Sequence, residues 1–222
     1  MDKKILLALF GLTIVALAAA ILLPSGRAPD VKPKLPWDIQ LDASGNSRVF
    51  GLTLGESTLG EARQVFEVQD KLSLFVSPEG DRDFESYFQR VYLSGIRADI
   101  IIKLVVDDKT STEMYERGSR ISQLGGGIKK VNLSKPDEAR LGSAAIGLIT
   151  YLPGADLEPA LITRRFGEPV RRITEPNGVE HWLYPDRGID IAVNADGKEV
   201  IHYIPPSMFQ ALVIDALDMV TE

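Results

Sequence analysis

The stretch from Val170 to Ile204, VRRITEPNGVEHWLYPDRGIDIAVNADGKEVIHYI, decides the fold class of this chain. Its alternation of apolar and polar residues predicts four short strands: Val170–Thr174, Val179–Tyr184, Ile189–Val193 and Val200–Ile204. Asn177-Gly178 supplies the positive φ angles of a tight hairpin between the first two, and short turns join the others. The pattern therefore predicts an antiparallel meander.

A helix is predicted directly before this meander. Asp156 is a favourable N-cap, Pro159 is tolerated because it falls in the first helical turn, and Gly167 ends the helix after Phe166. A small sheet needs such an apolar cover on one face. The second half of the chain is therefore expected to be an α+β unit.

The first half repeats this scheme more loosely. Thr58-Leu59-Gly60-Glu61 is a capping-box pattern that begins a helix ending near Phe66. Three strands are expected after it: Lys71–Val76, Tyr87–Leu93 and Ala98–Val106. Aligning Thr58 with Asp156 places the two units about 98 residues apart, which indicates a degenerate internal repeat.

Two further segments surround the second unit. A helix is expected from Thr110 to about Leu124, with Gly125-Gly126-Gly127 as its stop and a strand from Ile128 to Leu133 after it. At the C-terminus, Ser207-Met208-Phe209-Gln210 is another capping-box pattern, and the apolar stripe behind it predicts a docked helix.

The N-terminus predicts a membrane segment. Lys3 and Lys4 precede an uncharged run from Ile5 to Leu23, which is long enough to span a bilayer as a helix. Ala18-Ala19-Ala20 could mimic a signal-peptide cleavage site, but the apolar run continues beyond it, which favours an uncleaved anchor. The expected topology is single-pass in a bacterial-type inner membrane, with a cytoplasmic N-terminus and a periplasmic bulk.

These expectations together define an α+β protein with an N-terminal transmembrane helix and two related helix-and-antiparallel-sheet units. The expected boundaries are 1–24 for the membrane anchor, 25–48 for a proline-rich stalk, 49–107 for the first unit, 108–147 for a helical connector, and 148–222 for the second unit with the C-terminal helix.

Charge and cysteine content exclude several classes of function. Residues 1–34 carry five basic and two acidic side chains, which leaves 20 basic and 29 acidic side chains for the rest of the chain. Such an acidic body does not favour nucleic-acid binding, which requires a basic face. Without cysteine the chain has no disulfide, thiolate metal site or cysteine nucleophile.

Four short stretches resemble a known family. They are LITRRFGEP (161–169), HWLYP (181–185), GIDI (188–191) and VIHYI (200–204), and they are similar to the SmpA/OmlA (BamE-like) outer-membrane assembly lipoproteins. The resemblance covers about residues 150–206 and, loosely, 51–106. It implies a non-catalytic periplasmic interaction module, of the kind that tandem β-lactamase-inhibitor-like relatives build from similar units. The lipid anchor of that family does not carry over, because the chain lacks cysteine.

No enzyme motif stands out. His181 and His202 are expected on strands two apart in the meander, with their backbones about 10 Å apart and no third imidazole or thiolate to complete a typical zinc site. Asp81-Arg82-Asp83-Phe84-Glu85 lacks the spacing of a calcium loop. The 31 acidic residues offer many possible carboxylate pairs without selecting one. No cofactor is expected.

Three aromatic residues are the partner-binding candidates: Trp182, Tyr184 and Tyr203. Aromatic side chains on a sheet either pack between units or anchor an interface, and the sequence leaves both open. The expected function is a non-enzymatic, membrane-anchored scaffold or adaptor that binds another envelope protein. The alternative is a membrane-tethered hydrolase of envelope polymers that uses a carboxylate pair.

Overall fold

The computed structural model describes residues 33–194 and 199–221, and the chain from Lys34 onward forms one compact unit. The expected membrane segment from Ile5 to Leu23 lies outside the described residues. Among the described helices, none has the length and apolar character needed to cross a bilayer.

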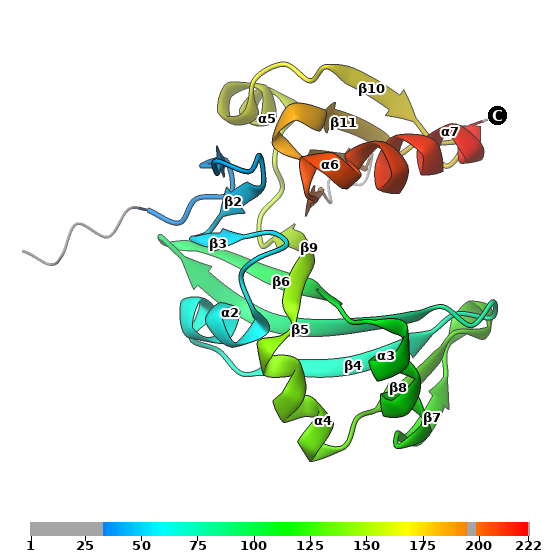
Figure 1. The fold of residues 1–222 in the computed structure, drawn as a ribbon. Helices are drawn as coiled ribbons and strands as arrows, with labels where there is room; N and C mark the ends of the chain where they lie inside the picture. The colour runs from blue at the N-terminus through cyan, green and yellow to red at the C-terminus, as the bar shows by residue number, and fades with distance from the viewer. Residues whose placement is uncertain (1–32, 195–198, 222) are drawn as a thin grey trace, which may run out of the picture. The chain divides into compact units, whose positions relative to one another are not determined.

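The unit combines several helices with one large antiparallel sheet (Figure 1). The sheet has ten strands: β4 (Asp70–Val76), β5 (Arg82–Leu93), β6 (Ile96–Val105), β7 (Ser119–Gln123), β8 (Lys129–Asn132), β9 (Ala145–Pro153), β10 (Arg171–Thr174), β11 (Glu180–Tyr184), β12 (Ile189–Val193) and β13 (Val200–Tyr203). Their spatial order is β10-β11-β12-β13-β9-β6-β5-β4-β8-β7. Strand β9 joins the two meanders, because it pairs with β6 on one side and β13 on the other.

A second, small sheet precedes the large one. It contains β1 (Gln40–Leu41), β2 (Ser47–Val49) and β3 (Leu52–Thr53). Phe50 between β2 and β3 is buried and stacks on Tyr151, with ring centroids 5.5 Å apart. Residues 34–48, expected to belong to the stalk, therefore lie within the compact unit.

The helices cover the sheet on both faces. They are α2 (Leu59–Phe66), α3 (Asp108–Glu116), α4 (Lys135–Arg140), α5 (Pro159–Phe166) and a C-terminal helix of α6 (Pro206–Phe209), the π-helical turn η4 (Gln210–Ile214) and α7 (Asp215–Thr221). Short 3-10 turns lie at η1 (Gly125–Gly127), η2 (Leu141–Ser143) and η3 (Pro185–Arg187).

The pairing register assigns each side chain to one face of the sheet. Tyr203 lies opposite Ile189, and Ile201 opposite Tyr151, so these side chains share a face that forms the main core. Helices α2 and α5 bury Phe66 and Phe166 in that core. We call this the helical face.

The other face, which we call the open face, has a second, smaller core at one end. Ile173 and Leu183 pack there against three residues of the C-terminal helix, Phe209, Val213 and Leu217. Figure 1 shows this helix, in orange and red, beside β10 and β11.

Several local expectations are confirmed. The Thr58 hydroxyl accepts a hydrogen bond from the Glu61 N–H, and the Glu61 carboxylate accepts one from the Thr58 N–H, so the capping box of α2 is present. The predicted strands at Lys71–Val76 and Ile189–Val193 correspond to β4 and β12.

Other local expectations are wrong. The helix expected from Thr110 to Leu124 ends at Glu116, and the chain continues as β7. Gly118 lies just after the helix end, where glycine disfavours a continuing helix, and a Cβ there would lie 2.3 Å from the Val131 side chain. The triglycine segment is consequently a turn between β7 and β8, not a helix stop.

Two predicted helix caps are also absent. The N-cap of α5 is Glu158, not Asp156, and the C-terminal helix starts after Pro205, not at a Ser207 cap. Neither N-cap residue forms a side-chain hydrogen bond to its helix. A proline occupies the first turn in both cases, so fewer backbone N–H groups need a partner there.

Candidate functional site

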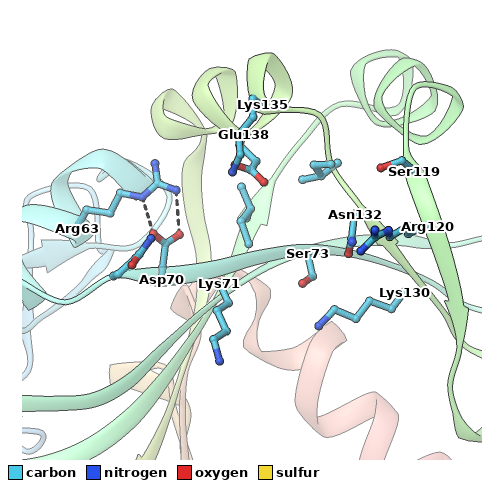
Figure 2. A pocket seen from close by; sticks show the side chains of 13 residues that line it. Arg63, Asp70, Lys71, Ser73, Ser119, Arg120, Lys130, Asn132, Lys135 and Glu138 are labelled. Atoms are coloured by element: carbon cyan, nitrogen blue, oxygen red, sulfur yellow. Dashed lines mark hydrogen bonds and ion pairs between the residues drawn. The ribbon is translucent and has the colours of Figure 1, made fainter.

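Strand β4 is only partly paired on one of its sides. It pairs with β5 along its whole length but with β8 only from Leu74 to Val76. In the described part of the chain, the segment from Asp70 to Ser73 therefore has no strand partner on the β8 side. A hollow of about 690 Å³ lies at this gap (Figure 2).

The gap arises because the chain leaves the sheet after β8. Ser134 is the N-cap of α4, and Lys135-Pro136 begins the helix, so the chain turns away instead of extending the ladder along β4. The Asp137 N–H donates a hydrogen bond to the Ser134 Oγ. The buried Asp137 carboxylate accepts a hydrogen bond of 2.7 Å from Arg117 Nη2. The Arg117 hydrogen bonds lower the pKa of Asp137, so the carboxylate remains charged and holds α4 in place.

The opposite end of the gap is fixed by Asp70. Arg63 of α2 donates two hydrogen bonds to the Asp70 carboxylate, both of 2.9 Å, and the Ser86 hydroxyl donates a third. Burial by itself would raise the pKa of Asp70, but the Arg63 and Ser86 contacts outweigh it and lower the pKa. Asp70 is therefore an anion whose charge is already neutralised.

The two faces of the gap differ in chemistry. Lys71 and Ser73 lie on the open face, where Lys130 also lies because it pairs with Phe75. Figure 2 shows the Lys71 and Lys130 side chains on the same side of β4. On the helical face the gap is lined by Leu72, which is half-buried, and Leu133, which is buried. The open face thus carries unpaired cations, whereas the helical face carries leucines beside two ion pairs.

The charge of the hollow is opposite to that of the body as a whole. Five cations line it, Arg63, Lys71, Arg120, Lys130 and Lys135, against the two anions Asp70 and Glu138. Arg63 pairs with Asp70 and Lys135 with Glu138. Within the described residues, Lys71, Arg120 and Lys130 form no ion pair, although Lys130 lies over the Phe75 ring. Three cations are therefore available to an anionic ligand.

A second hollow, of about 300 Å³, lies at the bulge in β5. It is lined by Gln89, Arg90, Arg97 and Asp99, and by the end of β9. The Asp99 carboxylate accepts hydrogen bonds from the Tyr87 hydroxyl and the Arg90 N–H. The carboxylate that lines this second hollow is thus already hydrogen-bonded.

The two histidines both contact one carboxylate. Asp190, on the strand between theirs, lies 2.9 Å from His181 Nδ1 and 3.2 Å from His202 Nδ1. Glu175 lies 3.1 Å from the other ring nitrogen of His181. The described residues contain no group of three or more side chains placed to hold a metal ion. The sequence signal for this contact is Asp190 itself, a charged residue between Ile189 and Ile191.

The three aromatic candidates all lie in the interior. Exposure is 2% for Trp182, 3% for Tyr184 and 0% for Tyr203. Trp182 pairs with Ile191 across the ladder, so the aromatic side chains share the helical face with the isoleucines and do not form a free face of their own. Of the two alternatives left open by the sequence, the structure shows core packing, and these residues are not a surface for a partner.

The sequence by itself does not predict the gap at β4. Its residues are ordinary strand and turn residues, and the only local sign is charge. From Arg117 to Pro136 the chain has five basic and no acidic residues, within a body rich in acids. Among the described residues, no strand pairs with Asp70–Ser73 on the side opposite β5, and this depends on strand pairing between distant segments.

No family model, curated protein or solved structure matches this chain. The resemblance to the SmpA/OmlA family therefore stays a prediction.

Proposed function

We propose that this chain is a non-enzymatic, membrane-anchored adaptor that binds an extended segment of another envelope protein along the free edge of β4. The observation that carries this proposal is the segment Asp70–Ser73, whose edge borders the hollow and has no described strand partner. A free strand edge binds extended peptides through main-chain hydrogen bonds, while side chains on alternate positions give selectivity.

The walls of the gap support binding by a preformed site. Arg63, Asp70 and Ser86 fix one end, and Arg117, Ser134 and Asp137 fix the start of α4 at the other. A rigid site loses little conformational entropy when it binds a ligand, which favours affinity. The gap is therefore suited to receive a strand without rearranging.

The membrane anchor and the two-unit organisation belong to the same proposal. The run from Ile5 to Leu23 tethers the body on the periplasmic side of an inner membrane. Each half of the body has an eight-residue helix, α2 or α5, followed by an antiparallel meander, which supports descent from related units of the BamE-like kind.

The hydrolase alternative has weaker support. Glycoside hydrolysis needs one carboxyl with a raised pKa facing a charged partner. In the hollow, Asp70 has a lowered pKa and Glu138 is paired with Lys135. Burial, followed by the charge of Asp83, raises the pKa of Glu85 on β5, but neither of these acids lines the two hollows described above. Loss of a polymer-hydrolysing activity in Glu85→Gln would favour the alternative.

Site-specific photo-crosslinking tests the binding proposal. A benzoylphenylalanine introduced at Lys71 in the full chain, in its native membrane, is expected to form an adduct with another protein. The same group at Tyr92, which is exposed but lies at the far end of β5, is the matched control. Equal adducts at both positions, or none at Lys71, would contradict strand capture at β4.

Cysteine labelling tests the anchor. Ser44 is exposed on the body, and the chain has no other cysteine, so Ser44→Cys gives a single reactive thiol. An impermeant maleimide is expected to label it in intact spheroplasts. Labelling only after lysis would show that the body is cytoplasmic.

A further inference from the structure

We propose that the segment captured at β4 alternates acidic and apolar residues. This inference rests on the proposed strand capture and adds the chemistry of the partner. The side chains of a strand point alternately to the two faces of the sheet it joins. A strand in the gap would therefore present every second residue to the cationic face and the others to the apolar face.

The open face of the gap selects acidic residues. Lys71 and Lys130 lie on this face, Ser73 lies between them as a hydrogen-bonding group, and Arg120 borders the hollow. Lys71 and Arg120 are exposed, and no described carboxylate pairs with them. Carboxylates on a bound strand would accept hydrogen bonds from these cationic side chains, and basic side chains at the same positions would be repelled.

The helical face of the gap selects apolar residues. Leu72 and Leu133 line it, and both are continuous with the main core. The charged groups on this side are already paired, Arg63 with Asp70 and Lys135 with Glu138. An apolar side chain would extend the core there, whereas a charged one would have to be desolvated without a partner.

A nucleic acid is a poorer match for this site. Its binding depends on many phosphate contacts along an extended basic surface, whereas the cations here are confined to one gap in a body rich in acids. The leucines beside β4 also have no role in binding phosphates. We therefore assign the gap to a peptide.

Peptide binding to the full chain in nanodiscs tests the inference. The probe is a labelled Glu-Val-Glu-Val-Glu peptide with blocked ends, and the measurement is fluorescence anisotropy. We expect it to bind at least tenfold more tightly than Lys-Val-Lys-Val-Lys and than Glu-Glu-Glu-Val-Val, which keeps the charge but not the alternation. A tenfold change corresponds to about 1.4 kcal/mol.

Charge reversal locates the binding site. The double variant Lys71→Glu, Arg120→Glu is expected to weaken binding of the alternating acidic peptide by about tenfold or more. Arg97→Glu, which places the same change at the second hollow, is the matched control and is expected to bind as the unmodified chain does. Unchanged unfolding midpoints would show that both variants fold.

The outcomes separate the two proposals. Equal binding of the acidic, basic and grouped peptides, with the Lys71 crosslink intact, would overturn the alternating pattern and leave strand capture in place. An N-methylated alternating peptide cannot donate its main-chain hydrogen bonds. Undiminished binding of that peptide would overturn strand capture itself. Tighter binding of an oligonucleotide than of any peptide, lost in the double variant, would reassign the gap to nucleic acid.

Discussion

Asp190 on β12 is a buried carboxylate that connects three neighbouring strands. It accepts hydrogen bonds from His181 on β11 and His202 on β13, and it has 5% of its side chain exposed. Burial by itself would raise the pKa of Asp190, but the contacts with the two histidines outweigh it and lower the pKa. Removing one member of such a buried cluster lowers the free energy of unfolding strongly, because the remaining charge loses its partner.

The pKa of His181 leads to a pH-dependent stability. Burial alone would lower this pKa, but the hydrogen bonds and charges of Asp190 and Glu175 outweigh it and raise the pKa. The resulting contribution to the free energy of unfolding is fully present below the unfolded pKa of about 6.5 and is lost as the pH rises through the folded value. We therefore expect stability, measured by urea unfolding, to fall as the pH rises above about 6.5.

The variant His181→Gln is expected to remove this decrease. Because the chain has only two histidines, His202→Gln leaves a single imidazole signal, so NMR titration of that variant reports His181 directly. A pKa at or below the ordinary value for histidine would contradict the assignment. Asp190 acts in the opposite sense, since its contribution is lost only as the pH falls through its lowered pKa.

Gly188 is a second position where one residue controls a tertiary contact. Its φ is +63°, and a Cβ there would lie 1.9 Å from the Ile204 carbonyl oxygen. We expect Gly188→Ala to destabilise the chain by more than about 3 kcal/mol, because backbone strain adds to a clash with backbone. Gly178→Ala is the matched control, since Gly178 also has positive φ but nothing within 4 Å of the added Cβ. Its cost is expected to be about 1 to 2 kcal/mol, from strain alone. Equal losses in urea unfolding would show that the close approach does not matter.

At the scale of elements, α2 and α5 have the same length and both end in phenylalanine, but their N-termini differ. Helix α2 begins with a complete capping box at Thr58 and Glu61, whereas α5 begins at Glu158-Pro159 without a side-chain cap. Both nevertheless bury a phenylalanine in the main core, Phe66 and Phe166. Packing therefore determines where each helix lies, and the caps adjust its stability.

The caps provide a direct comparison between the two helices. We expect Thr58→Ala to reduce the free energy of unfolding by about 1 kcal/mol, because the Glu61 N–H loses its acceptor. Asp156→Ala at the aligned position is expected to change it by less than about 0.5 kcal/mol. A loss of similar size at Asp156 in denaturant titrations would mean that it caps α5 in solution.

At the scale of the whole molecule, one sheet connects both halves of the chain. Strand β9 pairs with β6 of the first meander and with β13 of the second, and the main core contains residues from both. Neither meander can lose its structure without exposing apolar residues of the other. The body is therefore expected to behave as one cooperative unit.

This cooperativity is measurable because the only two tryptophans lie far apart in the sequence, Trp37 and Trp182. We expect a single urea transition in three measurements: the tryptophan fluorescence of Trp37→Phe, that of Trp182→Phe, and the far-ultraviolet circular dichroism of the unmodified chain. After correction for each variant's own stability, the three midpoints are expected to agree. Two separated transitions, one for each remaining tryptophan, would show that the halves unfold independently.

The local sequence was sufficient to predict most elements of the body. Asn177-Gly178 and the alternation around Ile189–Val193 determine the second meander, and the capping box at Thr58 determines the start of α2, because these signals depend on neighbouring residues only. The same reasoning failed from Arg117 to Gln123, where the chain forms β7 and pairs with the later strand β8, and where Gly118 lies against the distant Val131.

Only the tertiary structure decided which residues are buried and which are exposed. Trp182, Tyr184 and Tyr203 lie on strands, as the sequence predicts, yet the register between strands puts all three on the helical face. The free edge of β4 and the meeting of His181, Asp190 and His202 likewise depend on pairing between segments far apart in the chain. The physical reason is that local sequence determines the conformation of a strand, whereas the exposure of its edges and faces is determined by what packs against it.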